Sequence, residues 1–118
     1  CMSDTDFIKV ANRDELYVVN LLDVAYFKAE GHFTNVFYLG GTKLLLPCGI
    51  SKIFEKIKAI HGTNDTYLKV GRNLVINKCK VCCVNPVKEL IFFIGQNGML
   101  LNVHAPKSVL RDIMKELF

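Results

Sequence analysis

The sequence has no hydrophobic run of membrane-spanning length, no long charged tail and no internal repeat. Its longest apolar runs, such as Leu90–Ile94, are far shorter than the ~20 residues that a membrane helix requires. The composition, 51% hydrophobic and 22% charged over 118 residues, is typical of one globular domain. A chain of this length buries enough surface to form a core without metal or disulfides. We therefore expect a single domain with no cofactor and no membrane association.

Motifs for catalysis and metal binding are also missing. The sequence contains no glycine-rich phosphate loop, no Gly-x-Ser-x-Gly and no His-Glu-x-x-His. Its histidines, His32, His61 and His104, lie far apart with no acidic residue at a metal-ligand interval. We therefore expect neither an enzyme nor a metal site. A thiol enzyme that uses Cys82 or Cys83 is a minor alternative, because no neighbouring histidine would lower a thiol pKa.

The five cysteines are an odd number in a chain without a secretory leader, which argues against a disulfide framework and favours the cytoplasm. Cys79 and Cys82 have the Cys-x-x-Cys spacing of zinc sites. Residues 79–84 read as a strand, however, and strand residues three apart point to opposite faces. The sequence therefore predicts buried free thiols at these positions.

Positive charge is concentrated in one segment. The net charge is +4, and residues 66–90 contain five lysines and arginines against one acidic residue. Residues 1–65 contain seven lysines and arginines against eight acidic residues. A local basic stretch suggests a polyanionic partner, and a solvated strand face edged with lysine explains such a short run equally well.

Short β-type runs dominate the chain, and they cover residues 7–11, 15–19, 24–29, 33–39, 43–46, 67–70, 74–76, 79–84, 89–94 and 99–103. Asn97-Gly98 is the strongest hairpin signal between them. Residues 50–60 have helical spacing, with Ser51 available as a cap, and a second helix is predicted from Pro106 onward. Both apolar stripes are expected to face the core. The predicted fold class is mainly β with two helices.

The most informative segment is residues 67–77. Two apolar β segments flank Gly71-Arg72-Asn73, so this turn should hold a guanidinium and a carboxamide on a stiff support. Both groups suit base edges, because arginine can bond guanine and asparagine can bond adenine in bidentate fashion. Taken alone, the turn favours a plain hairpin in which Asn73 takes a positive φ and Arg72 is merely exposed.

From about residue 7 to 117, the chain resembles the LytTR-type DNA-binding domains of bacterial response regulators. Residues 67–81 resemble the family signature of an aromatic residue, an extended basic segment, a polar turn and a hydrophobic-Val-Asn sequence. Residues 22–34 are similar to the Asp-Ile-x-Tyr-aromatic-x-Ala strand with its aromatic-Thr continuation. The order of helix, signature hairpin, Asn97-Gly98 hairpin and final helix also agrees with the family.

The resemblance implies an elongated assembly of small antiparallel sheets that contacts double-stranded DNA through loops. Carried onto this chain, the contacts fall on three loops, which hold His32, Thr34 and Asn35; Lys69, Arg72 and Asn73; and His104 and Lys107. The second loop lies in the basic segment. His32 could equally be an exposed bystander, and His104 could instead cap the final helix.

The chain departs from the family pattern at two of these loops. Many members have His-Arg-Ser at the signature turn, where this chain has Gly71-Arg72-Asn73. Ahead of the last helix the family usually has Ser-Arg, whereas this chain has His104-Ala105-Pro106-Lys107. Lys107 can replace the charge of the missing arginine but not its bidentate geometry. We therefore expect an altered sequence preference.

The resemblance further implies the output domain of a transcriptional response regulator in a two-component system. Residues 1–6 would be the remnant of a linker, and residues 7–118 the DNA-binding domain. An upstream receiver domain would control it through phosphorylation-driven dimerisation on repeated half-sites. The alternative is a β-rich protein-interaction or sensory module that has lost DNA binding, which the missing arginine and the total of only three arginines favour.

Overall fold

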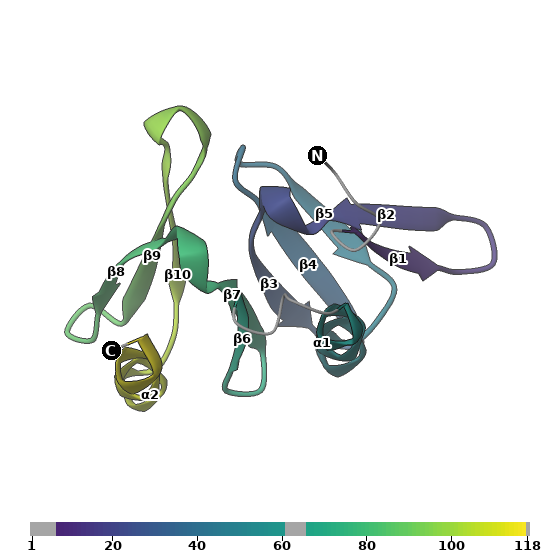
Figure 1. Cartoon of the computed structure of the whole chain (residues 1–118). Helices are drawn as coiled ribbons and strands as arrows, with labels where there is room; N and C mark the ends of the chain where they lie inside the picture. Colours follow the sequence, from purple (N-terminus) through teal and green to yellow (C-terminus); the bar gives the residue numbers. More distant parts are fainter. Residues whose placement is uncertain (1–6, 61–65, 118) are drawn as a thin grey trace.

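The computed structural model describes residues 7–60 and 66–117, and the expected linker remnant at residues 1–6 lies outside them. The described residues form three antiparallel sheets and two α-helices (Figure 1). An N-terminal hairpin pairs β1 (Phe7–Ala11) with β2 (Leu16–Asn20). The central sheet has the order β5-β4-β3-β7-β6, with strands β3 (Val24–Glu30), β4 (Phe33–Tyr38), β5 (Lys43–Leu46), β6 (Tyr67–Val70) and β7 (Leu74–Asn77).

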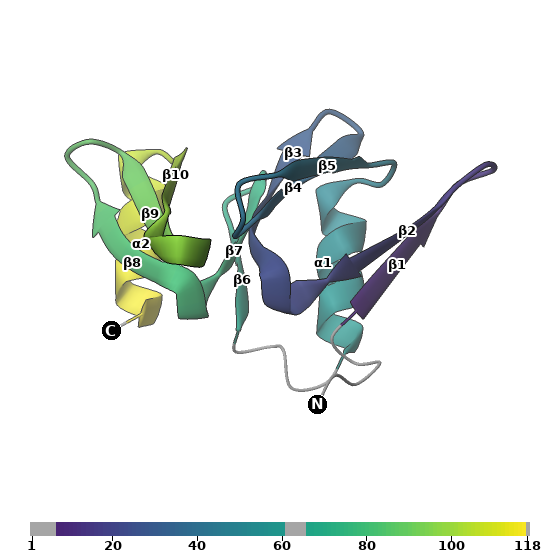
Figure 2. The same ribbon diagram turned by 90° about the horizontal axis from the view of Figure 1, so that it is seen from above.

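A third sheet has the order β10-β9-β8, with strands β8 (Val81–Asn85), β9 (Leu90–Ile94) and β10 (Leu100–His104). Helix α1 (Ile50–Ala59) follows β5, and helix α2 (Lys107–Leu117) follows β10. Figure 2 shows these units side by side: the third sheet with α2, the central sheet with α1, and then the N-terminal hairpin. The molecule measures 43 × 33 × 25 Å. The predicted fold class, an elongated and mainly β assembly with two helices, is confirmed.

The middle strands β3 and β7 of the central sheet are buried on both faces because their side chains alternate between two cores. Phe27 and Val75 face the first core, where they pack with Ile53 of α1 and with the N-terminal hairpin. Their chain neighbours Tyr26 and Ile76 face the second core, formed with the third sheet and α2. The β6–β7 hairpin is therefore anchored from both sides.

Both helices bury the stripes that the sequence predicts, and their beginnings differ from prediction. Helix α1 starts after Gly49 without any side-chain cap, and Ser51 is exposed within the first turn, so the predicted serine cap is wrong. Helix α2 starts at Lys107, one residue after Pro106. Its Leu110 and Ile113 are buried, which confirms the core-facing interpretation.

The prediction of buried thiols in a strand over residues 79–84 is wrong. Residues 78–80 form a 3₁₀ turn, and β8 begins only at Val81. Cys79, Cys82 and Cys83 are all exposed. The pairing of β8 with β9 shifts register between Val81 and Cys83, which interrupts the alternation of faces on which the prediction depended.

Within the described residues, no cluster of three or more histidine, cysteine or acidic side chains could hold a metal ion. Neither α1 nor α2 has the length and hydrophobicity of a membrane span, and no other described helix does.

Candidate nucleic-acid interface

The Gly71-Arg72-Asn73 turn forms the tip of the hairpin between β6 and β7. The two strands pair in register from Tyr67 opposite Asn77 to Val70 opposite Leu74, which confirms the predicted hairpin. Gly71 carries the positive φ of 62°, so the idea that Asn73 takes this conformation is wrong. Arg72 and Asn73 are both exposed. The tip therefore presents a guanidinium and a carboxamide to solvent.

The base of this hairpin is held by two buried polar side chains from the signature segment. The Tyr67 hydroxyl donates a hydrogen bond to the Leu21 carbonyl, and burial raises the pKa of this phenol well above its ordinary value. The Asn77 amide donates to the Val24 carbonyl at 2.9 Å, and its oxygen accepts the Cys79 N–H at 3.1 Å. These residues of the signature support the turn and do not line its surface.

The turn between β3 and β4 presents only one of its three predicted site residues. His32 is exposed beside Gly31. Thr34 is fully buried, and its hydroxyl donates to the Cys48 carbonyl at 2.7 Å. The amide of Asn35, which is 9% exposed, donates to the Glu30 carboxylate at 2.7 Å. In this structure Thr34 and Asn35 hold the turn in place, and His32 is the side chain that a ligand could reach.

The loop between β10 and α2 exposes His104 and Lys107. The Nε2 atom of His104 lies 3.2 Å from Glu89 Oε1, and Glu89 Oε2 accepts the backbone N–H of Lys107 at 3.2 Å. The cap of α2 is thus provided by Glu89, and the interpretation of His104 as the cap is wrong. Sequence reasoning missed Glu89, because 18 residues separate it from Lys107.

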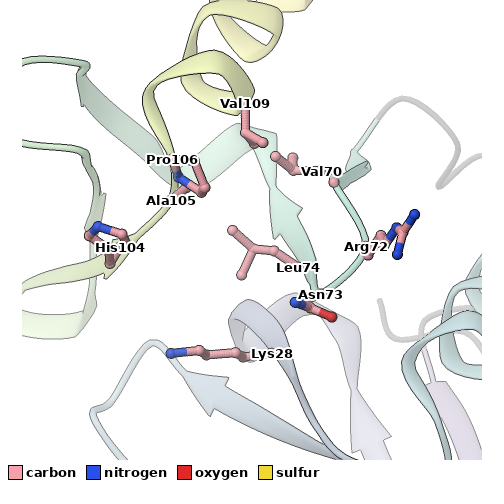
Figure 3. A pocket seen from close by; sticks show the side chains of 10 residues that line it. Lys28, Val70, Arg72, Asn73, Leu74, His104, Ala105, Pro106 and Val109 are labelled. Carbon is pink, nitrogen blue, oxygen red and sulfur yellow. The ribbon is translucent and has the colours of Figure 1, made fainter.

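Two clefts meet at Asn73 and bring the three loops together. The first, of about 460 Å³, is the β7–α2 cleft, and its lining includes Lys28, Arg72, Asn73 and His104. In Figure 3 the apolar side chains of this cleft lie between His104 and Arg72, and the Arg72 guanidinium points away from His104. The second, of about 490 Å³, is the β3–α1 cleft, and its lining includes His32, Lys52 and Asn73.

The surface around these clefts is rich in cations. Lys28, Lys52, Arg72 and Lys107 are exposed. Lys69 is half-buried, and its ammonium group donates to the Gly71 carbonyl at 3.3 Å, next to the tip. Sequence reasoning missed Lys28 and Lys52. Lys28 joins the site only because β3 pairs with β7, which sets it opposite Leu74 in the register.

Comparison with protein-family models gave no match, and comparison with curated proteins gave none either. Among solved structures, the chain is similar to the LytTr DNA-binding domain of a Bacillus cereus protein described as a methyl-accepting/DNA response regulator. The TM-score is 0.59 at 16% sequence identity, and the match covers 95% of each chain. An identity this low supports a statement about the fold alone. The chain therefore has the LytTR-type fold that its sequence resemblance implies.

Proposed function

We propose that this chain is a sequence-specific DNA-binding output domain of a bacterial transcriptional response regulator, and that it acts in the cytoplasm without catalysis. The observation that carries this proposal is the position of Asn73, which lines both clefts. Through it, the β3–β4 turn, the β6–β7 turn and the β10–α2 loop border one connected surface. A duplex lying on that surface would meet all three loops at once.

The side chains of this surface divide by chemistry into two groups. Arg72 and Asn73 carry the bidentate groups that distinguish guanine and adenine in the major groove, so they would read base edges. Lys28, Lys52 and Lys107 carry point charges, so they would neutralise phosphates and set the register of the protein on the duplex. His32 and His104 would contribute single ring nitrogens at the two ends of the surface.

The likeness to a domain described as part of a response regulator supports a regulatory arrangement in the same chain. In this arrangement an upstream receiver domain drives dimerisation, and two copies bind repeated half-sites on one duplex. The spacing of the half-sites would then match the distance between the DNA-binding surfaces of the two copies in the dimer.

Selection of bound duplexes from a random pool, followed by titration with the selected and a random duplex, tests the proposal. Affinity for both duplexes should fall many-fold between about 50 and 200 mM salt, because lysine contacts to phosphates release counterions. The selected duplex should bind more tightly than the random duplex at both salt concentrations. No binding to any duplex at the lower salt concentration would contradict the proposal and favour a protein-interaction or sensory module.

A further inference from the structure

We propose that Glu89 is a positioning residue of the β10–α2 loop, and that it determines sequence specificity by fixing the His104 ring against the start of α2. This inference rests on the proposed function. It assigns a role to a residue that would not touch DNA itself.

Glu89 makes three separate bonds to this one loop. Its backbone carbonyl accepts the Ala105 N–H at 3.1 Å. Its two carboxylate oxygens reach the His104 ring and the Lys107 N–H, each at 3.2 Å. One side chain thus defines both where the imidazole lies and where the helix begins.

The backbone of Glu89 is in an unfavourable conformation. Its φ is 58°, a left-handed value that residues with a Cβ atom rarely adopt. Such conformations persist where the surrounding contacts over-determine them, and they cluster at functional sites. At Glu89 this conformation coincides with three bonds to one loop.

Stability of α2 alone does not explain this arrangement. The side chains of His104 and Glu89 are 63% and 39% exposed, and a polar contact this exposed stabilises a fold little. Helix α2 is already anchored by the buried Leu110 and Ile113. The main effect of the Glu89 carboxylate is therefore on the direction of the His104 ring, which lines the β7–α2 cleft.

The charge of Glu89 supports a role in specificity over one in affinity. Glu89 is the single acidic residue within the basic segment 66–90. A carboxylate at the edge of a DNA-binding surface repels phosphates and lowers affinity for every sequence. A residue that weakens binding to every duplex, and that also orders a loop in contact with the bases, improves discrimination between duplexes.

The test compares the affinity ratio between the selected and a random duplex for the wild type and five variants. E89A should lower this ratio about threefold to tenfold, the range of one or two lost hydrogen bonds. E89Q should keep the ratio, because its amide oxygen can accept the Lys107 N–H while its NH2 group donates to Nε2 of a neutral imidazole, and it should bind both duplexes more tightly. D14N, which removes a charge from the N-terminal hairpin loop, is the matched control and should change neither quantity.

A double-mutant cycle separates positioning from a purely structural effect. H104A should lower the ratio as E89A does, and the E89A/H104A double variant should lose no more than either single variant. Full additivity, or an unchanged ratio in E89A or in H104A, would overturn the role of Glu89. If E89A fails to fold, H104A and E89Q still decide the question. Wild-type protein that binds no duplex would overturn the proposed function as well, so the two failures are distinguishable.

Discussion

The carbonyl of Asn73 accepts a hydrogen bond of 2.8 Å from the backbone N–H of Ala29. This bond continues the pairing of β3 and β7 beyond Leu74 and ties the tip of the signature hairpin to the strand that leads into the β3–β4 turn. Because the bond uses only backbone atoms, the Asn73 side chain stays free to face a ligand. The relative position of the two turns is therefore set by the central sheet itself.

Arg72 should contribute base recognition and not charge alone. We expect R72A to weaken binding of the selected duplex by about 1–3 kcal/mol and to relax preference at one base pair. R72K should keep binding to a random duplex but lose the preference, because an ammonium group cannot form the bidentate contact. Anisotropy titrations with duplexes changed one base pair at a time measure this. R13A, which removes an exposed arginine from the N-terminal hairpin loop, should behave as the wild type.

Lys28 should contact the DNA backbone. K28A is expected to weaken binding to all duplexes alike and to reduce the slope of log affinity against log salt by about 1. The matched control is K9A, because Lys9 is an exposed strand lysine on β1, outside both clefts. A change of base preference in K28A, or an equal loss of affinity in K9A, would show that the proposed footprint is wrong.

Thr34 should matter for stability and not for recognition. T34V leaves the Cys48 carbonyl without its hydroxyl donor, and we expect it to lower the free energy of unfolding by about 1–3 kcal/mol. T34S retains the hydroxyl and should lose less stability. Urea denaturation gives the free energies, and titrations well below the melting temperature give the base preference. A changed preference in T34V at unchanged stability would make Thr34 a contact residue after all.

Gly71 should be required for its backbone conformation. An added Cβ would meet Val109 Cγ2 at 3.6 Å, which is an ordinary contact, so the cost of substitution comes from the positive φ. We expect G71A to lower the free energy of unfolding by about 1–2 kcal/mol. G71N should lower it less, because asparagine tolerates the left-handed region. Equal losses in the two variants would indicate a steric cause instead.

Local patterns were sufficient for the hairpins and helices. The Asn97-Gly98 signal lies between β9 and β10, and both residues take positive φ, as a tight turn there requires. The apolar stripe of α1 is periodic along the chain, so its buried face was predictable. The prediction failed at residues 79–84, because an irregular register cannot be inferred from the alternation of residue types.

The composition of the candidate interface was only partly predictable. The exposure of Arg72 and Asn73 was predictable, because both residues lie in a short turn between two apolar strands that are adjacent in the chain. Burial of Thr34 depends on the Cys48 carbonyl, which the strand pairing brings to it.

The amino-acid order alone was enough to specify short antiparallel strands, two amphipathic helices and an Arg-Asn turn, since each depends on neighbours within a few positions. Folding in three dimensions placed Lys28 in the lining of the β7–α2 cleft, placed Glu89 against the β10–α2 loop and turned Thr34 inward. These three outcomes depend on groups 14 to 46 residues apart, because Lys28 pairs with Leu74, Glu89 reaches Lys107 and Thr34 bonds Cys48. Contacts at such separations follow from sheet register and layer packing, which no local pattern encodes.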